Sequence, residues 1–372
     1  MAELFCFRCG PSSQDRAEFC ERCGAPLSFS RAPEKTLRPA DLRGRGVWRY
    51  SPFLPEVEPL TLGEGRTPLI PAPRLAELLG VEILLKLEGL NPTGSFKDRG
   101  AAVMVAVLRK KGAKKLCDDS SGNAGASLSA YAARAGIPAR IFVPAYASGP
   151  KLRQIEAYGA ELVRVPGPRP AATAALLGEL EKNPDLVYAS HNHSPYFLAG
   201  LRTLAYEIAE DLRFQEVDHV VVPVGGGALY LGLFYGFSEL LRLGWVKKMP
   251  RIHAVQAAAC APIVRAHLAG EEEVEEVELG ETVAEGVRIP KPARGAEILW
   301  ALRSCGGEAL AVTEEEIMEA QRELARKEGV YVEPTSALSL AGLLRLRVQG
   351  IIREGERVIL PLTGSGLKSA KP

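Results

Sequence analysis

From about residue 80 onwards, short apolar runs alternate with longer stretches in which small and apolar residues recur at helical spacing. The apolar runs predict strands at 81–87, 115–118, 140–143, 161–165, 186–189, 219–223 and 357–362. The longer stretches predict helices at 97–111, 123–135, 150–158, 171–181, 203–212, 313–327 and 336–347, and another that starts at Ala228. This regular alternation predicts an α/β protein with a mostly parallel sheet covered by helices on both faces. Ligands of such sheets bind at the carboxyl ends of the strands, so the loops that follow strands are expected to carry the chemistry.

Length and charge narrow the functions to consider. A chain of 372 residues is too long for one simple core and suits two catalytic subdomains with a small appendage. Lysine and arginine number 46 and aspartate and glutamate number 45, so the net charge is +1. No overall charge attracts the protein to nucleic acid or to an acidic membrane. We therefore expect a small neutral or zwitterionic molecule as its partner.

One uncharged stretch, 220–237, is 18 residues long and so approaches the length of a membrane span. It contains Pro223 and three consecutive glycines, which would break a spanning helix, so a buried strand, turn and helix is the better interpretation. The first residues of the chain carry charges and cysteines where a secretory signal needs an apolar run. We therefore expect a cytoplasmic protein that does not enter membranes.

Four of the seven cysteines lie near the amino terminus, as Cys6-x-x-Cys9 and, after ten intervening residues, Cys20-x-x-Cys23. Four thiolates complete a tetrahedral Zn²⁺ shell with no open position, which indicates a structural site. So short a segment cannot bury enough apolar surface to fold alone, and the metal would supply its folding free energy. Disulfides or a redox pair fit less well, because a cytoplasmic compartment is reducing and no helical pattern follows Cys9.

A turn, NPTG at 91–94, follows the first predicted strand and leads into the segment SFKDRG. Ser95 is placed to cap the helix that begins near Lys97. The helix dipole favours anions at this end, so a lysine there is electrostatically misplaced. A solvated surface lysine is one interpretation. The other is an amine that must be partly neutral, as a Schiff-base nucleophile is.

Two further loops lie between a predicted strand and a predicted helix. The loop SSGN at 120–123 offers hydroxyls and backbone N–H groups at a helix start, which suits a carboxylate. The loop GGG at 225–227 offers backbone without side chains at a helix start, which suits a phosphate. Either loop alone is common in α/β proteins. A lysine loop, a carboxylate loop and a phosphate loop on one sheet together indicate a functional site.

These motifs resemble those of the pyridoxal phosphate enzymes of the second fold type, the tryptophan synthase beta-like enzymes, and among them the threonine synthase group. The segment NPTGSFKDRG at 91–100 is similar to that group's lysine motif, which is highly specific. The other similar segments are EGxTPL at 64–69, SSGN at 120–123, EG at 328–329, EP at 333–334 and TGxGLK at 363–368. The resemblance extends over about residues 60–368.

The resemblance implies a fold and an arrangement of domains. We expect two doubly wound, three-layer α/β/α subdomains, preceded by a zinc knuckle (a zinc ribbon) at 1–30 and by a linker that wraps the body at 31–60. The catalytic unit is expected at 61–372, with a smaller subdomain at about 99–195 inserted into a larger one at about 61–98 and 196–372. We also expect a homodimer.

The resemblance also implies a role for each motif residue. Lys97 would hold pyridoxal phosphate as a Schiff base and, once freed, would move the α-proton of the substrate. Thr363 would face the pyridine nitrogen, where a neutral hydroxyl favours loss of a leaving group over reprotonation on the cofactor. Asn123 would bind the ring hydroxyl. The phosphate would be held by Gly225, Gly226, Gly227 and Ala228, and the substrate carboxylate by Ser120, Ser121, Gly122 and Asn123.

Some positions depart from the threonine synthase pattern. Phe197 stands where that group typically has an arginine for the substrate's phosphate, and VPVGGGAL at 222–229 resembles serine/threonine ammonia-lyases. Two enzymatic functions therefore stay open. One is a threonine synthase-like lyase that performs elimination or replacement on a homoserine-derived or similar amino acid. The other is a threonine/serine ammonia-lyase, a dehydratase.

A third hypothesis, from another class, is a non-catalytic zinc-ribbon protein that binds a partner. It would leave the lysine motif unexplained. The run HNH at 191–193 is not expected to bind a metal, because no carboxylate or cysteine lies at ligand spacing from it. These side chains are expected to line the substrate pocket or a loop surface.

Overall fold

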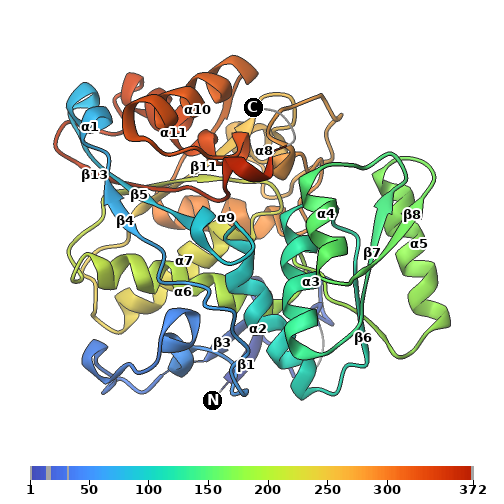
Figure 1. Cartoon of the computed structure of the whole chain (residues 1–372). Coiled ribbons are helices and arrows are strands. Elements are labelled where there is room, and N and C mark those ends of the chain that lie inside the picture. The colour runs from blue at the N-terminus through green and yellow to red at the C-terminus, as the bar shows by residue number, and fades with distance from the viewer. Residues whose placement is uncertain (1, 14–17, 32, 370–372) are drawn as a thin grey trace.

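The computed structural model describes residues 2–13, 18–31 and 33–369, and its two largest sheets lie in neighbouring lobes (Figure 1). The strands of the larger sheet, in spatial order, are β12 (Ala309–Val312), β11 (Arg251–Ala257), β10 (His219–Pro223), β13 (Arg357–Pro361), β5 (Glu82–Lys86) and β4 (Leu69–Pro71). The strands of the smaller sheet are β8 (Glu161–Val165), β7 (Ala139–Pro144), β6 (Lys115–Asp118) and β9 (Leu186–Tyr188). The predicted α/β class is confirmed.

The larger sheet is parallel except for β4, which pairs antiparallel with β5 at one edge. Figure 1 shows it between two helical layers. One layer holds α1 (Pro73–Leu79), α10 (Glu314–Glu328) and α11 (Pro334–Val348), and the other holds α6 (Pro195–Asp211), α7 (Ala228–Arg242) and α9 (Gly295–Cys305). With both faces covered, every residue of β10 is buried, which explains its continuous apolar run.

The smaller sheet is parallel throughout and has helices on both sides. Figure 1 shows α3 (Asn123–Ala135) and α4 (Pro150–Ala157) on the side nearer the large lobe and α5 (Arg169–Lys182) on the outer side. Helix α2 (Lys97–Lys110) packs against both α3 and α6. It therefore lies at the junction of the two lobes.

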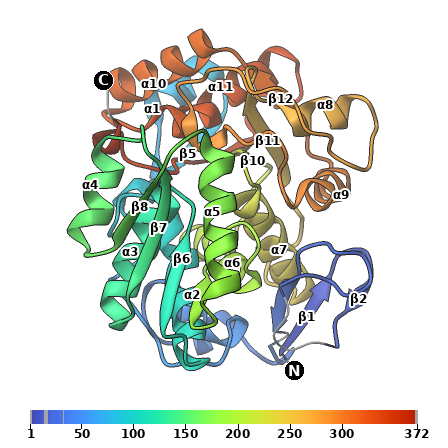
Figure 2. The same cartoon turned by 90° about the vertical axis from the view of Figure 1, so that its right-hand side faces the viewer.

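The amino-terminal segment forms a three-stranded antiparallel sheet of β1 (Ala2–Cys6), β2 (Gly10–Pro11) and β3 (Ser28–Arg31). Figure 2 shows it beside the large lobe, below α9 and α7. Its aromatic side chains pack on those helices: Phe5 lies edge-on to Tyr235 at 5.5 Å, and Phe7 lies 6.1 Å from Trp300. The knuckle is thus an integral layer of the body and not a free arm.

The segment at 33–60 contains the short 3-10 helices η1 (Pro39–Asp41) and η2 (Gly46–Phe53). Phe53 of η2 is buried against Tyr206 of α6, with ring centres 4.5 Å apart. The predicted linker therefore packs on the body along η2. The predicted limits of the domains stay a prediction.

The predicted strands and helices are present with small shifts at their ends, with one larger exception. The helix predicted at 203–212 already begins at Pro195. A proline suits the first helical position, and the hydroxyl of Ser194 caps the helix by accepting a hydrogen bond from the N–H of Phe197. The sequence pattern also fails to predict α1, β4, α8 (Pro262–Leu268), α9, β11 and β12.

The uncharged stretch at 220–237 is divided among β10, the glycine loop and α7, as predicted. No helix in the described parts of the chain has the length and hydropathy needed to cross a membrane.

Candidate active site

Lys97 is the first residue of α2, and two backbone hydrogen bonds hold the loop before it against the loop that follows β13. The N–H of Phe96 donates to the carbonyl of Thr363 at 3.0 Å, and the N–H of Ser365 donates to the carbonyl of Gly94 at 3.0 Å. The predicted lysine loop and the predicted pyridine-nitrogen residue are thus neighbours at the carboxyl edge of the larger sheet.

The predicted cap at Ser95 is wrong. Phe96 is the residue that precedes the helix, so Ser95 lies one position too early, and its buried hydroxyl has no hydrogen-bond partner in the described chain. The loop is closed instead by Asp98, which accepts from the N–H of Thr93 at 2.7 Å and from its hydroxyl at 2.6 Å.

The side-chain amine of Lys97 makes no hydrogen bond or ion pair to any described residue. It lies 4.8 Å from the ring centre of Phe96 and 5.5 Å from that of Phe197. Burial lowers its pKa from 10.5 to about 8, although the negative charges of Asp118 and Glu333 oppose the shift. An amine with this pKa is partly neutral near pH 7 to 8, which favours the nucleophile over the surface lysine.

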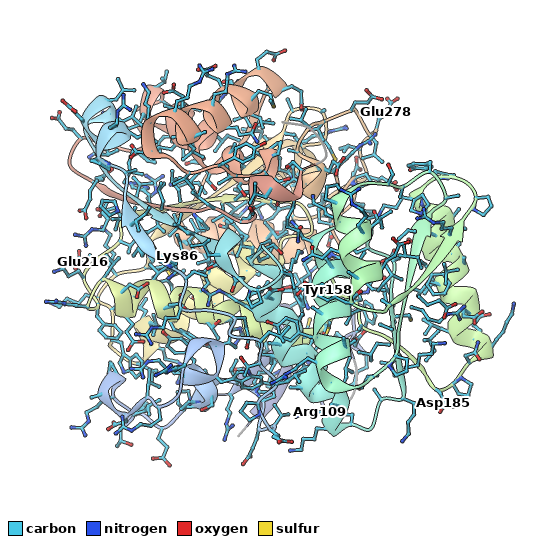
Figure 3. All side chains as sticks on the ribbon, viewed as in Figure 1. Lys86, Arg109, Tyr158, Asp185, Glu216 and Glu278 are labelled. Atoms are coloured by element: carbon cyan, nitrogen blue, oxygen red, sulfur yellow. The ribbon has the colours of Figure 1, made fainter. Side chains whose placement is uncertain are left out.

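Two buried lysines near the same edge are held by hydrogen bonds or ion pairs. The amine of Lys86 lies 2.7 Å from both Glu207 and Asp211 and donates to a backbone carbonyl. Figure 3 labels Lys86 among the elements of the large lobe and Glu216 at the edge of the molecule. The amine of Lys368 donates to the carbonyl of Thr93 at 2.6 Å. Of these three lysines, only Lys97 has an amine free to react.

The loop at 120–123 follows β6 and starts α3. Only glycine fits at position 125, because a Cβ there would collide with the carbonyl of Ser120. The amide nitrogen of Asn123 donates to the two carboxylate oxygens of Glu333, at 2.9 and 3.2 Å, and its amide oxygen has no partner in the described chain. Because Glu333 also acts on the pKa of Lys97, the carboxylate loop and the lysine loop border one site.

The glycine loop at 225–227 forms a hollow, called the cradle below, that a side chain on any of the three residues would fill. A Cβ on Gly225 would lie 2.7 Å from the carbonyl of Gly286, and a Cβ on Gly227, which has φ +86°, would collide with Ile298. A Cβ on Gly226 would meet the side chain of Asn192. The bare loop opens α7, whose first N–H groups have no partner within the helix, so it suits a phosphate.

Thr363 lies two residues after the end of β13 and is buried. Its hydroxyl is 2.9 Å from that of Ser336, which also accepts from the N–H of Gly364 at 2.8 Å. The hydroxyl of Thr363 is therefore fixed in position and uncharged, as the predicted role beside a pyridine nitrogen requires.

Comparison with known families matches residues 60–364 to "Pyridoxal-phosphate dependent enzyme". The chain belongs to the pyridoxal-phosphate-dependent enzymes.

Two relatives of this pyridoxal-phosphate-dependent enzyme are similar over almost the whole chain. The threonine synthase of Methanocaldococcus jannaschii is 38% identical over 378 residues, which cover 98% of this chain and 92% of the relative. The threonine synthase of Methanosarcina acetivorans is 38% identical over 385 residues, which cover 99% and 92%. Among solved structures, the threonine deaminase of T.th. is 29% identical with a TM-score of 0.69, covering 82% of this chain and 94% of that one. These matches remove the hypothesis of a non-catalytic partner-binding protein.

The residues present fit pyridoxal phosphate. The cradle at 225–227 is free of side chains, the amine of Lys97 is unpaired, and the buried oxygens of Ser95 and Asn123 lack partners in the described chain. The cofactor carries an aldehyde and a phosphate. The free amine of Lys97 can react with the aldehyde, and the glycine loop can bind the phosphate.

Arg202 is the cation closest in sequence to Phe197. It is 1% exposed, inside α6, and its guanidinium lies 2.7 Å from Glu239 of α7. Because α6 begins at Pro195, Arg202 lies on the face that packs against α7. In this pyridoxal-phosphate-dependent enzyme Arg202 serves the packing of two helices.

Sequence reasoning missed a pair of neighbouring carboxylates, Asp118 and Asp119, at the end of β6. Asp119 accepts hydrogen bonds from Thr173 (2.5 Å) and Tyr188 (3.0 Å). Asp118 is 1% exposed, and neither of its oxygens has a side-chain hydrogen-bond partner among the described residues. Nδ1 of His191 lies 3.5 Å from Oδ2. Two consecutive acids at the end of a predicted strand were the signal that could have revealed them.

A buried network of charges lies under the lysine loop. Arg99, two residues after Lys97 and fully buried, lies 2.7 Å from Glu88 and 2.9 Å from Glu207. The positive charges of Arg99 and Lys86 overcome the effect of burial and lower the pKa of Glu207 to about 2. Glu207 therefore stays ionised, and the network fixes the first turn of α2.

The four cysteines of the knuckle come together as predicted. Their sulfur atoms all lie within 4.8 Å of one another, and those of Cys6 and Cys23 are 3.5 Å apart. Tetrahedral zinc with bonds of about 2.3 Å places its sulfurs about 3.8 Å apart, so this cluster has the right size for one ion.

Arg294, at the start of α9, joins the knuckle to the loop at 191–193. Its guanidinium donates to the carbonyl of Leu27 at 2.6 Å and to that of His193 at 3.0 Å, while Glu297 balances its charge at 2.8 Å. The same loop carries His191, beside Asp118, so a single buried side chain connects the knuckle with a segment of the candidate site.

Proposed function

We propose that this enzyme binds pyridoxal phosphate on Lys97 and eliminates or replaces a leaving group on a small amino acid, as a threonine synthase-like lyase. The observation that carries the proposal is the amine of Lys97, which belongs to a half-buried residue, is unpaired among the described residues and is shifted to a pKa of about 8. It lies where the lysine loop, the carboxylate loop and the loop after β13 meet. The 38% identity to threonine synthases over nearly the full chain supports the reaction class.

Pyridoxal phosphate, when bound, withdraws electrons from the α-carbon of an amino acid and so makes its proton acidic. Gly225, Gly226, Gly227 and Ala228 would bind the phosphate through backbone N–H groups, Asn123 the ring hydroxyl and Thr363 the ring nitrogen. Ser120, Ser121 and Gly122 would bind the substrate carboxylate at the start of α3, with Asn123 beside them. An amine with a pKa of about 8 can accept the α-proton and return it near neutral pH, which suits Lys97.

The leaving group distinguishes the two enzymatic candidates. The threonine synthase relatives support a homoserine-derived substrate. The aromatic ring of Phe197 beside Lys97 supports the second candidate, a threonine/serine ammonia-lyase, because a buried phosphate ester needs cationic or N–H partners that phenylalanine cannot supply. The similarity to a threonine deaminase structure is consistent with that candidate.

Three further parts complete the proposal. One Zn²⁺ held by Cys6, Cys9, Cys20 and Cys23 is supported by the size of the sulfur cluster. A homodimer is proposed from the family resemblance alone. A cytoplasmic location is proposed from the charged, cysteine-bearing first residues of the chain.

Borohydride reduction of the purified holoenzyme followed by peptide mapping tests the central claim. We expect the reduced cofactor on Lys97, and we expect Lys97→Ala to lose turnover by several orders of magnitude because the covalent link and the base disappear together. Lys368→Ala is the matched control, since its amine is buried but engaged with Thr93. Cofactor found on Lys86 or Lys368 would overturn the assignment.

A further inference from the structure

Asp118 and His191 follow adjacent parallel strands, β6 and β9, and meet at the carboxyl edge of the smaller sheet. The carboxyl group of Asp118 is buried, yet no side chain of the described residues donates a hydrogen bond to it, while Nδ1 of His191 lies 3.5 Å from it. A buried carboxyl group without donors is costly unless it is protonated or meets a ligand. The ring of His191 lies 6.0 Å from that of Phe197, whose centre is 5.5 Å from the amine of Lys97, so Asp118 and the reacting lysine lie in one cluster of contacts. The charges of Asp118 and Lys97 also act on the pKa of each other.

The neighbouring Asp119 shows what an ordinary structural carboxylate looks like here. Although burial opposes it, the hydrogen bond from Thr173, the positive charge of Arg169 and the hydrogen bond from Tyr188 hold the pKa of Asp119 below its usual value. Burial, together with the negative charge of Asp119, raises the pKa of Asp118 well above its usual value. Adjacent carboxyl groups with pKa values driven apart are a common arrangement for an ionised group and a proton donor.

We propose that Asp118 is the acid that protonates the leaving oxygen of a substrate with a free hydroxyl group. The inference rests on the proposed function in its second form, a threonine/serine ammonia-lyase, and makes its substrate class definite: a small hydroxy amino acid and not a phosphate ester. Burial lowers the pKa of His191 well below 6.5, so the neighbouring imidazole is neutral and does not hold the proton in place of Asp118.

In the proposed step the α-proton passes to Lys97, and the electron pair left at the α-carbon forms the new carbon–carbon double bond. The carbon–oxygen bond breaks with its electron pair on oxygen, and that oxygen takes the proton of Asp118 and leaves as water. The proton gained by Lys97 then passes back to the carboxylate of Asp118 by way of water, which restores both groups. Hydroxide is a poor leaving group without this proton, whereas phosphate and halide leave as stable anions. The unsaturated product then takes up one water to give ammonia and a 2-oxo acid.

Asp118→Asn in the holoenzyme separates this role from a structural one, because the two side chains have the same shape. The probes are L-serine, whose hydroxyl must be protonated, and β-chloro-L-alanine, whose chloride needs no proton. We expect kcat for L-serine to fall about 10²- to 10⁴-fold, the usual range for one acid group, and kcat for β-chloro-L-alanine to change less than about threefold. Asp119→Asn is the control, and we expect it to change both substrates by one common factor.

An equal loss with both substrates in Asp118→Asn, at unchanged cofactor absorbance and melting temperature, would refute the role as acid. Turnover of β-chloro-L-alanine but not of L-serine by the unaltered enzyme would also overturn this inference while leaving the proposed function in place. A holoenzyme that turns over neither compound, or that carries its cofactor elsewhere than on Lys97, would instead mark a failure of the proposed function.

Discussion

The ring centre of Phe197 lies 5.5 Å from the amine of Lys97. The ring also packs directly on α2, where a Cβ on Gly100 would come within 2.7 Å of it. An apolar side chain thus occupies the position at which the threonine synthase group typically has a phosphate-binding arginine. Arg202 and Lys86 do not take over that place, because Arg202 packs on α7 beside Glu239 and Lys86 is paired with Glu207.

O-phosphohomoserine should therefore be a poor substrate. We expect its kcat/KM to be at least about 100-fold below the better of L-threonine and L-serine, since leaving a buried dianion unpaired costs several kcal/mol. The measurement is all three values on one preparation. Phe197→Arg should raise the value for the phosphate ester and lower those for the free hydroxy amino acids.

A high kcat/KM for the phosphate ester, with no deamination of L-threonine or L-serine, would contradict this prediction and favour a plain threonine synthase activity. Arg169 would then be the first residue to replace. It is exposed in the first turn of α5, makes no ion pair in the described chain, and its charge lowers the pKa of Lys97.

The pKa of Lys97 predicts how the cofactor-free enzyme captures pyridoxal phosphate. Only the neutral amine reacts, so the rate should rise about tenfold per pH unit below pH 8 and level off above it. Stopped-flow absorbance at the Schiff-base band, from pH 6 to 10.5, measures the profile. Free Nα-acetyllysine is the reference. A rate that keeps rising to about pH 10.5, as for the reference, would show an ordinary surface amine.

The cysteine cluster predicts one zinc per chain. Cys20→Ser should lose the metal and lower the melting temperature, because the ion supplies the folding free energy of the knuckle. Cys260→Ser is a matched control, since Cys260 is equally buried but lies outside the cluster. Elemental analysis with thermal unfolding checks both variants. Equal, near-zero zinc in the unaltered protein and in Cys20→Ser would disprove a metal site.

The bridge formed by Arg294 predicts that the knuckle influences catalysis. Arg294→Lys keeps the charge, but its single nitrogen cannot replace the three guanidinium nitrogens, which donate separately to Asn192, to Glu297, and to the carbonyls of Leu27 and His193. We expect kcat/KM to fall about tenfold with the zinc content unchanged. Arg303→Lys, an exposed position on the same helix, should leave both unchanged. Full activity of Arg294→Lys would show that the bridge only stabilises the fold.

Local signals in the sequence were enough to predict that a helix begins near Lys97, that a glycine loop precedes α7 and that the four cysteines come together. Each depends on residues close together in the chain, whose turn and helix-start chemistry is visible in one short motif. The pairing of Asp118 with His191 could not be predicted, because it requires β6 and β9 to be adjacent in the sheet. The place of Arg202 could not be predicted for a related reason, since the start of α6 at Pro195 decides which face it occupies.

The buried charges around Arg99 restrict how the molecule can move. Helix α2 packs along α3, in the small lobe, but its first turn is fixed by Glu88 and Glu207, which belong to the large lobe. If α2 slid along its axis, the buried guanidinium group of Arg99 would lose its ion pairs with Glu88 and Glu207. That loss costs far more free energy than a rotation of α2 that keeps both ion pairs. Any closure of the small lobe over a substrate must therefore pivot about the beginning of α2, so that the amine of Lys97 keeps its place while the walls around it move.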